Sequence, residues 1–228
     1  MRDTVDLERA REQHAEYCRT LAELGLEVVS IPPDDAHADA CFVEDNAVVH
    51  KGKALICRMA MDSRRGEIGP VEEVLSQYKR VRHAEPPATV EGGDVIHLPD
   101  RLISGISERT NPDGVQEMRD WLEVQVDEVA DPEMMHLKSY VTFIGRGTVI
   151  ATEKFRGHKA LGGLCVLVTP KGEEYAADTL AVGEVVLMPA GRPRAAETVR
   201  QAGFDVRTID VSEFEKCDGA VTCLSIIF

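Results

Sequence analysis

The stretch GDVIHLPDRLISG, residues 93–105, holds the pattern that decides the fold. A polar residue, Asp94, precedes a short apolar strand, a Pro-Asp turn follows, and a second apolar strand ends the stretch. A helix is predicted next, over residues 112–123, because Asn111 suits the N-cap and Pro112 suits the first helical position. The unit therefore runs strand, turn, strand and helix, and another strand is predicted to follow it.

The same unit recurs along the chain, marked each time by a polar residue ahead of a strand. Successive marks stand 49, 42, 42 and 40 residues apart in the sequence. A repeat of about 40 to 50 residues indicates radial or stacked repetition, and the helices exclude an all-β propeller of the WD type. Five units around an axis would bring the marks toward its centre. The marks are Asp45, Asp94, His136, Asp178 and Asp218.

We therefore predict an α/β fold of five strand-strand-helix-strand repeats in a single domain, residues 1–228. The last unit starts at Asp218 and is predicted to end in an apolar strand that carries Cys223. The other elements predicted from the pattern are an amphipathic outer helix over 7–24, helices over 68–79 and 193–202, and a strand over 205–209.

The charge balance limits the classes of partner. The chain has 26 Lys and Arg against 40 Asp and Glu, a net charge of −14. Nucleic acids and anionic membranes require basic surface, so we expect neither as a partner. A small cationic substrate is mildly favoured.

The cysteines indicate a reducing compartment. They are scattered without a CxxC pair, which fits neither a disulfide framework nor a zinc site, so no metal is expected. The sequence has no N-terminal signal pattern and no apolar run near 18 residues, and we expect a cytoplasmic protein. The six cysteines are Cys18, Cys41, Cys57, Cys165, Cys217 and Cys223.

Cys223 has two interpretations. Cysteine is among the residue types most often buried, so a thiol in an apolar strand can simply fill the core. Alternatively, the last strand delivers a nucleophile. Polar groups that converge inside an apolar architecture are costly unless they are paired or functional, and this favours the second interpretation.

Six strings together resemble one known family. They are DACFVED at 39–45, SRRGE at 63–67, TVEGGD at 89–94, RTN at 109–111, HLKS at 136–139 and DGAVTCLS at 218–225. In this order they are similar to the dimethylarginine dimethylaminohydrolase family of the guanidino-modifying (pentein) superfamily. The resemblance implies a five-fold pseudosymmetric α/β propeller. Family members begin with another strand and a mobile loop, so the first repeat is expected to be incomplete at its N-terminus.

The resemblance also implies the catalytic groups. A guanidinium carbon is stabilised by resonance, so its hydrolysis needs a strong nucleophile such as a thiolate. Cys223 matches the family nucleophile, His136 matches the general acid and base, and Glu91 is expected to hold the guanidinium. The thiol and the imidazole carry both half-reactions, so no cofactor is expected.

The remaining matches concern substrate binding. Glu44 and Asp45 resemble guanidinium-binding carboxylates, which repel one another in an empty site and so favour a cation. Arg64 and Arg109 match positions that clamp the α-carboxylate of an amino-acid substrate, since the guanidinium fork binds carboxylates in a bidentate manner. Contacts near the α-amino end are implied for two further groups, the Asp39 side chain and the Cys217 backbone carbonyl.

The leading hypothesis is hydrolysis of Nω-methylated arginine to citrulline and methylamine or dimethylamine, through a covalent cysteine adduct. An enzyme similar to arginine deiminase, or one acting on another guanidino or ureido amino acid, is the nearest alternative. A non-catalytic binding member of the fold and an amidinotransferase are more distant ones. The sequence leaves open the exact substrate, the meaning of the short N-terminus and whether the chain forms a homodimer.

Overall fold

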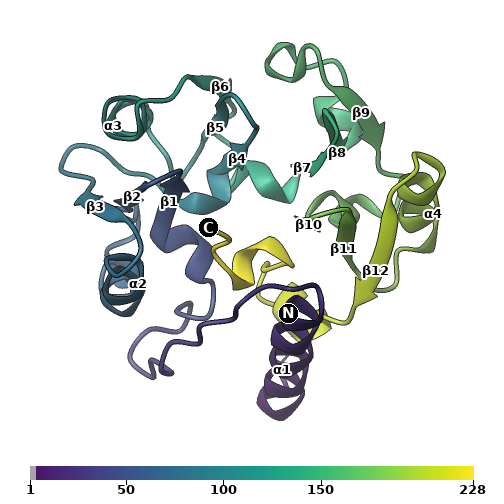
Figure 1. The fold of residues 1–228 in the computed structure, drawn as a ribbon, viewed down its shortest axis with the longest axis horizontal. Coiled ribbons are helices and arrows are strands. Elements are labelled where there is room, and N and C mark those ends of the chain that lie inside the picture. Colours follow the sequence, from purple (N-terminus) through teal and green to yellow (C-terminus); the bar gives the residue numbers. More distant parts are fainter. Residues whose placement is uncertain (1–3) are drawn as a thin grey trace. The chain divides into compact units, whose positions relative to one another are not determined.

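The computed structural model describes residues 4–228, which form a mixed α/β architecture (Figure 1). Across these residues the strands make four three-stranded sheets, and in each the middle strand pairs antiparallel with the first strand and parallel with the third. The sheets are β1 (Ala47–His50), β2 (Lys53–Ile56) and β3 (Arg80–His83); β4 (Val95–His97), β5 (Leu102–Ile106) and β6 (Val126–Ala130); β7 (Val141–Gly145), β8 (Thr148–Ala151) and β9 (Cys165–Val168); and β10 (Leu180–Val182), β11 (Val185–Pro189) and β12 (Asp205–Ile209).

The helices fall largely where the sequence predicts them. The prediction over 112–123 is confirmed by a helix at Pro112–Leu122, and the Asn111 side chain accepts the Gly114 N–H as an N-cap. The predicted helix over 68–79 is too long, because the chain turns after Leu75. The α-helices are α1 (Leu7–Glu23), α2 (Ile68–Leu75), α3 (Pro112–Leu122), α4 (Pro193–Gln201) and the short α5 (Ser212–Glu215).

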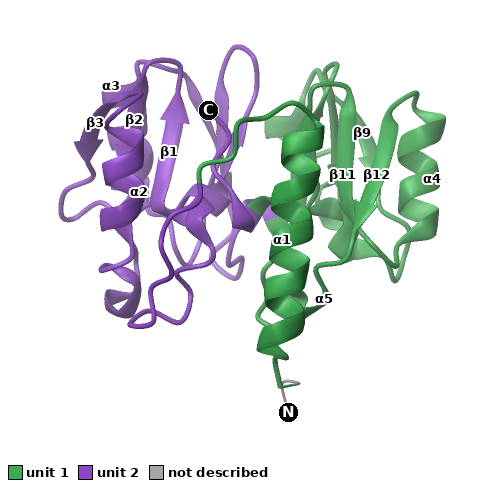
Figure 2. Cartoon of the chain, turned by 60° about the horizontal axis from the view of Figure 1, so that its bottom comes forward, with its two compact units in different colours: residues 1–29, 139–222 green, residues 30–138, 223–228 purple. Residues whose placement is uncertain are grey.

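The described chain divides into two compact units (Figure 2). Unit 1 comprises the residues up to 29 and residues 139–222, and unit 2 comprises residues 30–138 and 223–228. Each unit holds two of the sheets. The prediction of a single domain over 1–228 is not tested by this division and stays a prediction.

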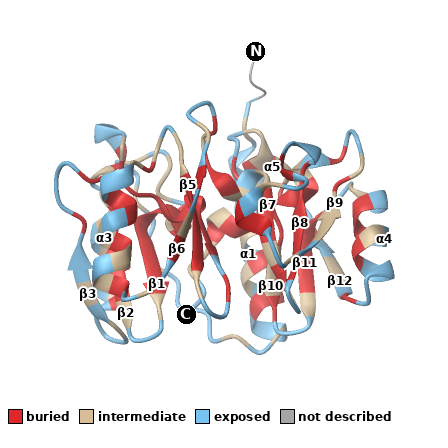
Figure 3. Ribbon diagram, turned by 90° about the horizontal axis from the view of Figure 1, so that it is seen from above, coloured by how far each residue is buried: buried red, intermediate tan, exposed pale blue. Residues whose placement is uncertain are grey.

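The strands supply most of the core of each unit, and the helices cover it with their apolar faces. In unit 2, Leu55 of β2 and Leu102 of β5 are fully buried together with Val115 and Met118 of α3. In unit 1, α4 buries Val199 in the cluster that contains Val186 of β11. Figure 3 shows the resulting pattern, with buried residues concentrated along the strands. This packing gives the site a rigid frame.

The third repeat differs from the prediction. Two 3-10 helices, η5 (Glu153–Phe155) and η6 (Lys159–Leu161), replace the expected α-helix between β8 and β9. The reason is glycine: Gly157 and Gly163 adopt φ of 77° and 84°, a left-handed conformation that interrupts an α-helix. A strand-strand-helix-strand order therefore does not hold for every repeat.

The end of the chain also differs. Cys223 lies on a 3-10 helix, η8 (Thr222–Leu224), and the predicted terminal strand is wrong. The Thr222 N–H bonds to the Asp178 carboxylate at 3.0 Å, so this donor is satisfied without a strand partner. Asp218, predicted to be one of the central polar marks, is exposed and has φ of 61°.

Three buried aspartates ahead of strands make one recurring bond. Asp45 Oδ1 accepts the Gly93 N–H at 3.0 Å, and Asp94 Oδ1 accepts the Leu137 N–H at 2.9 Å. The third is the bond from Thr222 N–H to Asp178 Oδ1. Each aspartate thus holds a backbone N–H at the start of a later segment of its own unit.

Among residues 4–228, no helix has both the length and the apolar character to cross a membrane.

Candidate active site

Three predicted site residues meet in the interior of unit 2. Asp45 lies on the 3-10 helix η1 (Val43–Asn46), Glu91 directly precedes η3 (Gly92–Asp94), and His136 directly precedes η4 (Leu137–Ser139). The Nε2 atom of His136 lies 2.9 Å from Glu91 Oε2 and 3.6 Å from Asp45 Oδ1. All three residues are buried, and Glu91 is wholly so.

Two glycines allow this close approach. A Cβ added at Gly93 would lie 2.8 Å from Asp45 Oδ1 and 2.9 Å from His136 Cγ. A Cβ added at Gly92 would overlap the backbone oxygen of Glu44. Any larger residue at either position would therefore push the three segments apart.

The cluster holds His136 in its charged form. Burial lowers its pKa, but the charge of Asp45, the hydrogen bond to Glu91 and the charges of Asp94 and Glu91 together raise that pKa to about 9. Burial likewise acts to raise the pKa of Asp45, yet the charges of His136 and Arg64 outweigh it, and that pKa is lowered. Near neutral pH the imidazolium is thus available as a proton donor.

Arg64 also belongs to this cluster. Its guanidinium donates to both carboxylate oxygens of Glu67, bonds to Asp45 Oδ2 at 2.8 Å and lies 3.7 Å from Glu91 Oε2. Only 6% of the residue is exposed. The structure therefore places Arg64 against carboxylates predicted to bind a substrate cation. Its predicted role as a clamp for a substrate carboxylate stays a prediction.

Arg109 is the complementary case. It lies in the turn after β5, and its Nε and Nη1 atoms are buried without a hydrogen-bond partner. Buried guanidinium donors without acceptors are costly, and so they are expected to have one when the protein works. A substrate carboxylate would supply it, which supports the prediction for this residue.

The other predicted residues are placed as follows. Glu44 is buried and accepts a hydrogen bond from Lys138 Nζ at 2.6 Å. The Asp39 carboxylate is half-exposed and lies 4.0 Å from Arg64 Nε. Cys223, in unit 2, is partly buried, whereas Cys217 is exposed and belongs to unit 1. The predicted roles of all four stay predictions.

Two residues of the cluster were assigned no role from the sequence. Glu67 binds Arg64 from three positions further along the chain, and Lys138 binds Glu44. Both stand inside strings that carry the family resemblance, SRRGE and HLKS. Their membership of these strings was the available signal, and opposite charge at a spacing of three residues was a second signal for Glu67.

One atom from each of Asp45, Glu91 and His136 comes within 4.8 Å of the others, a spacing that a metal ion could use. However, Arg64 already supplies positive charge to Asp45, and His136 carries a proton on the nitrogen that faces Glu91. A metal would have to displace both of them. We assign no metal to these residues, and the expectation of none stays a prediction.

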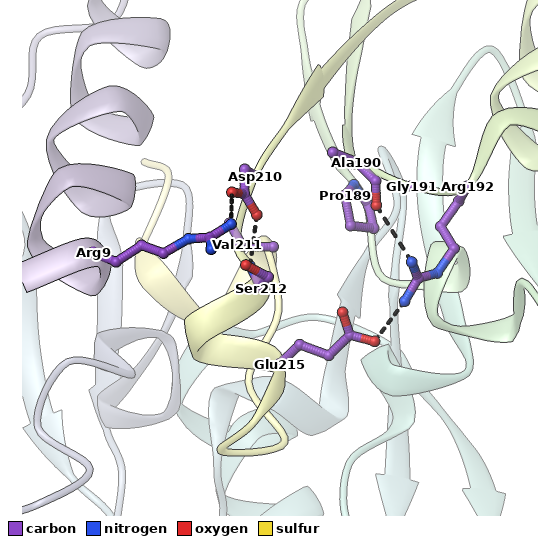
Figure 4. A pocket seen from close by; sticks show the side chains of 9 residues that line it. All are labelled: Arg9, Pro189, Ala190, Gly191, Arg192, Asp210, Val211, Ser212 and Glu215. Carbon is purple, nitrogen blue, oxygen red and sulfur yellow. Dashed lines mark hydrogen bonds and ion pairs between the residues drawn. The ribbon is translucent and has the colours of Figure 1, made fainter. Parts of the chain in front are cut away.

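A pocket in unit 1 is distinct from this cluster (Figure 4). Its volume is about 250 Å³, and its lining includes Arg9, Asp210, Arg192 and Glu215. The charged groups already pair with one another, Arg9 with Asp210 and Arg192 with Glu215. None of the predicted site residues lines the pocket, so it is not the predicted site.

Comparisons with known proteins bear on the whole chain. A family described as N,N dimethylarginine dimethylhydrolase, eukaryotic, matches residues 2–154. The N(G),N(G)-dimethylarginine dimethylaminohydrolase of Pseudomonas aeruginosa is 34% identical over 228 residues, covering 98% of this chain and 90% of that protein. The protein of the same name from Streptomyces coelicolor is 37% identical over 233 residues, covering 99% and 88%. A solved structure of the P. aeruginosa protein, a cysteine-to-serine mutant complexed with citrulline, matches with a TM-score of 0.95 at 32% identity, covering 98% of this chain and 90% of that one.

Proposed function

The chain belongs to the dimethylarginine dimethylaminohydrolase family, and we propose that it hydrolyses Nω-methylated arginine to citrulline and methylamine or dimethylamine. The observation that carries this proposal is the guanidinium of Arg64, held by Asp45 and Glu67 and lying close to Glu91. Planar guanidinium groups suit such carboxylates, which supports the proposal that Asp45 and Glu91 receive the reacting group of the substrate beside Arg64.

In the proposed mechanism, the thiolate of Cys223 attacks the guanidinium carbon and forms a C–S bond. His136 gives its proton to the departing amine as the C–N bond breaks. The neutral imidazole then takes a proton from water, whose oxygen attacks the same carbon, and the C–S bond breaks to release citrulline and the thiolate. The sum is one water consumed and one amine released.

The raised pKa of His136 suits the first half of this cycle. With a pKa of about 9, the imidazole is protonated near neutral pH before the amine departs. Glu91, bonded to the imidazole at 2.9 Å, would hold both His136 and the substrate guanidinium. Asp45, on η1 ahead of β1, would complete the site for the guanidinium.

The other end of the substrate is proposed to bind the remaining predicted residues. The buried donors of Arg109 would receive the α-carboxylate. Arg64 would contribute to the same clamp, and the Asp39 side chain and the Cys217 backbone carbonyl would bind near the α-amino end. Glu44 would accompany Asp45 at the guanidinium.

We also propose that the four sheets and the C-terminal segment form one five-fold α/β propeller domain over 1–228. The recurring aspartate bonds from Asp45, Asp94 and Asp178 support repetition. A cytoplasmic location stays a prediction.

The test is citrulline release from dimethylarginine, monomethylarginine and plain arginine, each with the wild-type chain. Methylated arginines are expected to be turned over faster than arginine, and equal or faster turnover of arginine would overturn the substrate choice. Cys223→Ser should abolish turnover, while Cys41→Ser, a change at an exposed thiol, should preserve it. Retained activity in Cys223→Ser would remove the covalent mechanism.

A further inference from the structure

Asp94 lies at a junction between two parts of the site in unit 2. It is fully buried on η3, three residues after Glu91. Its Oδ1 accepts the Leu137 N–H at 2.9 Å, and its Oδ2 accepts the Ser107 hydroxyl at 2.6 Å. These two bonds lead to different functional side chains.

The first bond leads to the imidazole. Leu137 follows His136 directly and is itself buried, so fixing the Leu137 N–H fixes the backbone that carries the imidazole. The Asp94 N–H also donates to the Glu91 backbone oxygen at 3.1 Å. The same short turn thus fixes both members of the pair that meets at 2.9 Å, His136 and Glu91.

The second bond leads to the unsatisfied arginine. The Ser107 hydroxyl gives its one hydrogen to Asp94 and accepts the N–H groups of Arg109 at 2.9 Å and Thr110 at 3.1 Å. A hydroxyl has one donor and two acceptor positions, so all of its capacity is used. The Arg109 Nε and Nη1 atoms have no hydrogen-bond partner, so the bond at the Arg109 backbone N–H is a contact that fixes where this side chain begins.

The fold leaves room for this carboxylate. A Cβ added at Gly105 of β5 would overlap Asp94 Oδ1 and would lie 2.9 Å from Met134 Cε. A strand interior normally disfavours glycine, and a close approach by another group is the usual reason for one there. The strand beside the site is therefore shaped around Asp94.

We infer that Asp94 is a positioning residue, whose one carboxylate sets the places of the acid–base imidazole of His136 and of the carboxylate-binding guanidinium of Arg109. This inference rests on the proposed function for those two roles. In this inference Asp94 acts on the reaction through Leu137 and Ser107 and not by contact with the substrate.

The test compares three variants. Asp94→Asn keeps an acceptor for the Leu137 N–H but presents an amide N–H to Ser107, which leaves the serine hydrogen without its acceptor. Ser107→Ala removes the hydrogen bonds that link Asp94 to the Arg109 backbone and leaves the Leu137 bond in place. Thr142→Val, in unit 1, removes a buried hydroxyl that bonds to the Ala177 oxygen at 2.7 Å and serves as the control for lost stability.

Each variant has a distinct expected result. For dimethylarginine, Asp94→Asn is expected to lower kcat by about 100-fold and to raise KM by about 10-fold, because small misplacements of reacting groups have effects of this size. Ser107→Ala is expected to raise KM with little change in kcat, and to leave unchanged the KM for dimethylarginine amide, which has no carboxylate. Thr142→Val should preserve kcat and KM for both substrates.

A second readout does not depend on turnover. His136 is faced by Asp45, Glu91 and Asp94, with Lys138 two residues away, and NMR titration of its ring is expected to give a lower pKa in Asp94→Asn. If Asp94→Asn loses only stability, as Thr142→Val does, with kcat, KM and the His136 titration all unchanged, the inference is overturned.

If the wild-type chain releases citrulline from none of these substrates, the proposed function fails instead. The His136 titration then still tests the inference, because a carboxylate that holds the imidazole backbone at this distance must also affect the pKa of the ring. An unchanged titration in Asp94→Asn would count against the inference in that case also.

Discussion

Asp94 in unit 2 and Asp178 in unit 1 make the same bond in different surroundings. Each is buried ahead of a strand, and each accepts a backbone N–H through Oδ1, at 2.9 Å from Leu137 and at 3.0 Å from Thr222. The second oxygen of Asp178 bonds to the hydroxyl of that same Thr222, at 3.3 Å. The second oxygen of Asp94 instead reaches another loop through Ser107. The same bond from an aspartate to a backbone N–H is thus joined by a second bond to the same residue at Asp178, whereas at Asp94 it is joined by a bond to another loop.

The polar groups beside these strands differ between the units as well. In unit 1, Thr142 and Thr179, the residue after Asp178, lie 3.0 Å apart and bond through their hydroxyls. In unit 2, Asp45 lies ahead of β1 and pairs with the charged side chains of Arg64 and His136. Buried charges are costly to assemble and often add nothing to stability over apolar packing. The cluster of buried charges around His136 therefore supports the proposal that the chemistry takes place in unit 2.

The largest effect that tests this comparison is expected from the histidines. His136→Asn should lower kcat by about 100- to 10,000-fold, the usual contribution of a general acid and base. The matched change in unit 1 is His158→Asn, at a partly exposed histidine that accepts the Ala160 N–H at 3.2 Å. Citrulline release should be unaffected there, and an equal loss in both variants would contradict a reaction confined to unit 2.

The next effect is the pH dependence of stability. The folded pKa of His136 is about 9, against about 6.5 in an unfolded chain. A raised pKa contributes stability that is fully present below pH 6.5 and is lost as pH rises through 9. The free energy of unfolding is therefore expected to fall over this range by at most about 3 kcal/mol.

Urea denaturation at pH 6, 7.5 and 9 measures this fall, with His136→Gln as the comparison. The variant should show a smaller fall, because its side chain does not titrate. An identical fall in both proteins would mean that His136 is not the group responsible.

The sequence predicts the local elements well, because their signals are local. The Asn111 cap and Pro112 define the start of α3, and the periodic apolar strands define the hairpins. The predictions fail where a few residues or a single tertiary bond determine the local structure. The positive φ angles of Gly157 and Gly163 prevent an α-helix in the third repeat. The bond from the Thr222 N–H to Asp178 satisfies a donor at the position where a terminal strand was predicted.

The site is predicted in part. The recognised strings identify Asp45, Glu91 and His136, which the structure brings together. The orientation of Arg64 could not be predicted, since it depends on which carboxylates surround it after folding. Glu67 is three residues from Arg64 in the sequence, but Asp45 is 19 residues from it. Whether the Arg64 guanidinium binds these carboxylates or a substrate therefore depends on the tertiary structure.

A smaller effect is expected from Asp178→Asn. The amide keeps an acceptor for the Thr222 N–H but loses the charge, so the free energy of unfolding should fall by about 1–3 kcal/mol. The His136 titration should not move, in contrast with Asp94→Asn. Asp205→Asn, at an exposed position of β12, is the control and should leave the urea midpoint unchanged. A shifted His136 titration in Asp178→Asn would show that the two aspartates are not separate in function.

The smallest effect is expected at the pocket of unit 1 (Figure 4). Arg9 pairs with Asp210 at 3.0 Å, but the two side chains are 54% and 48% exposed, whereas those of Arg64 and Asp45 are 7% and 3% exposed. Water and salt screen an exposed pair, so it adds little to stability. Arg9→Gln is therefore expected to leave both the urea midpoint and citrulline release at their wild-type values. A clear loss of activity in this variant would give the pocket a role in the reaction, and the assignment of the chemistry to unit 2 would then be incomplete.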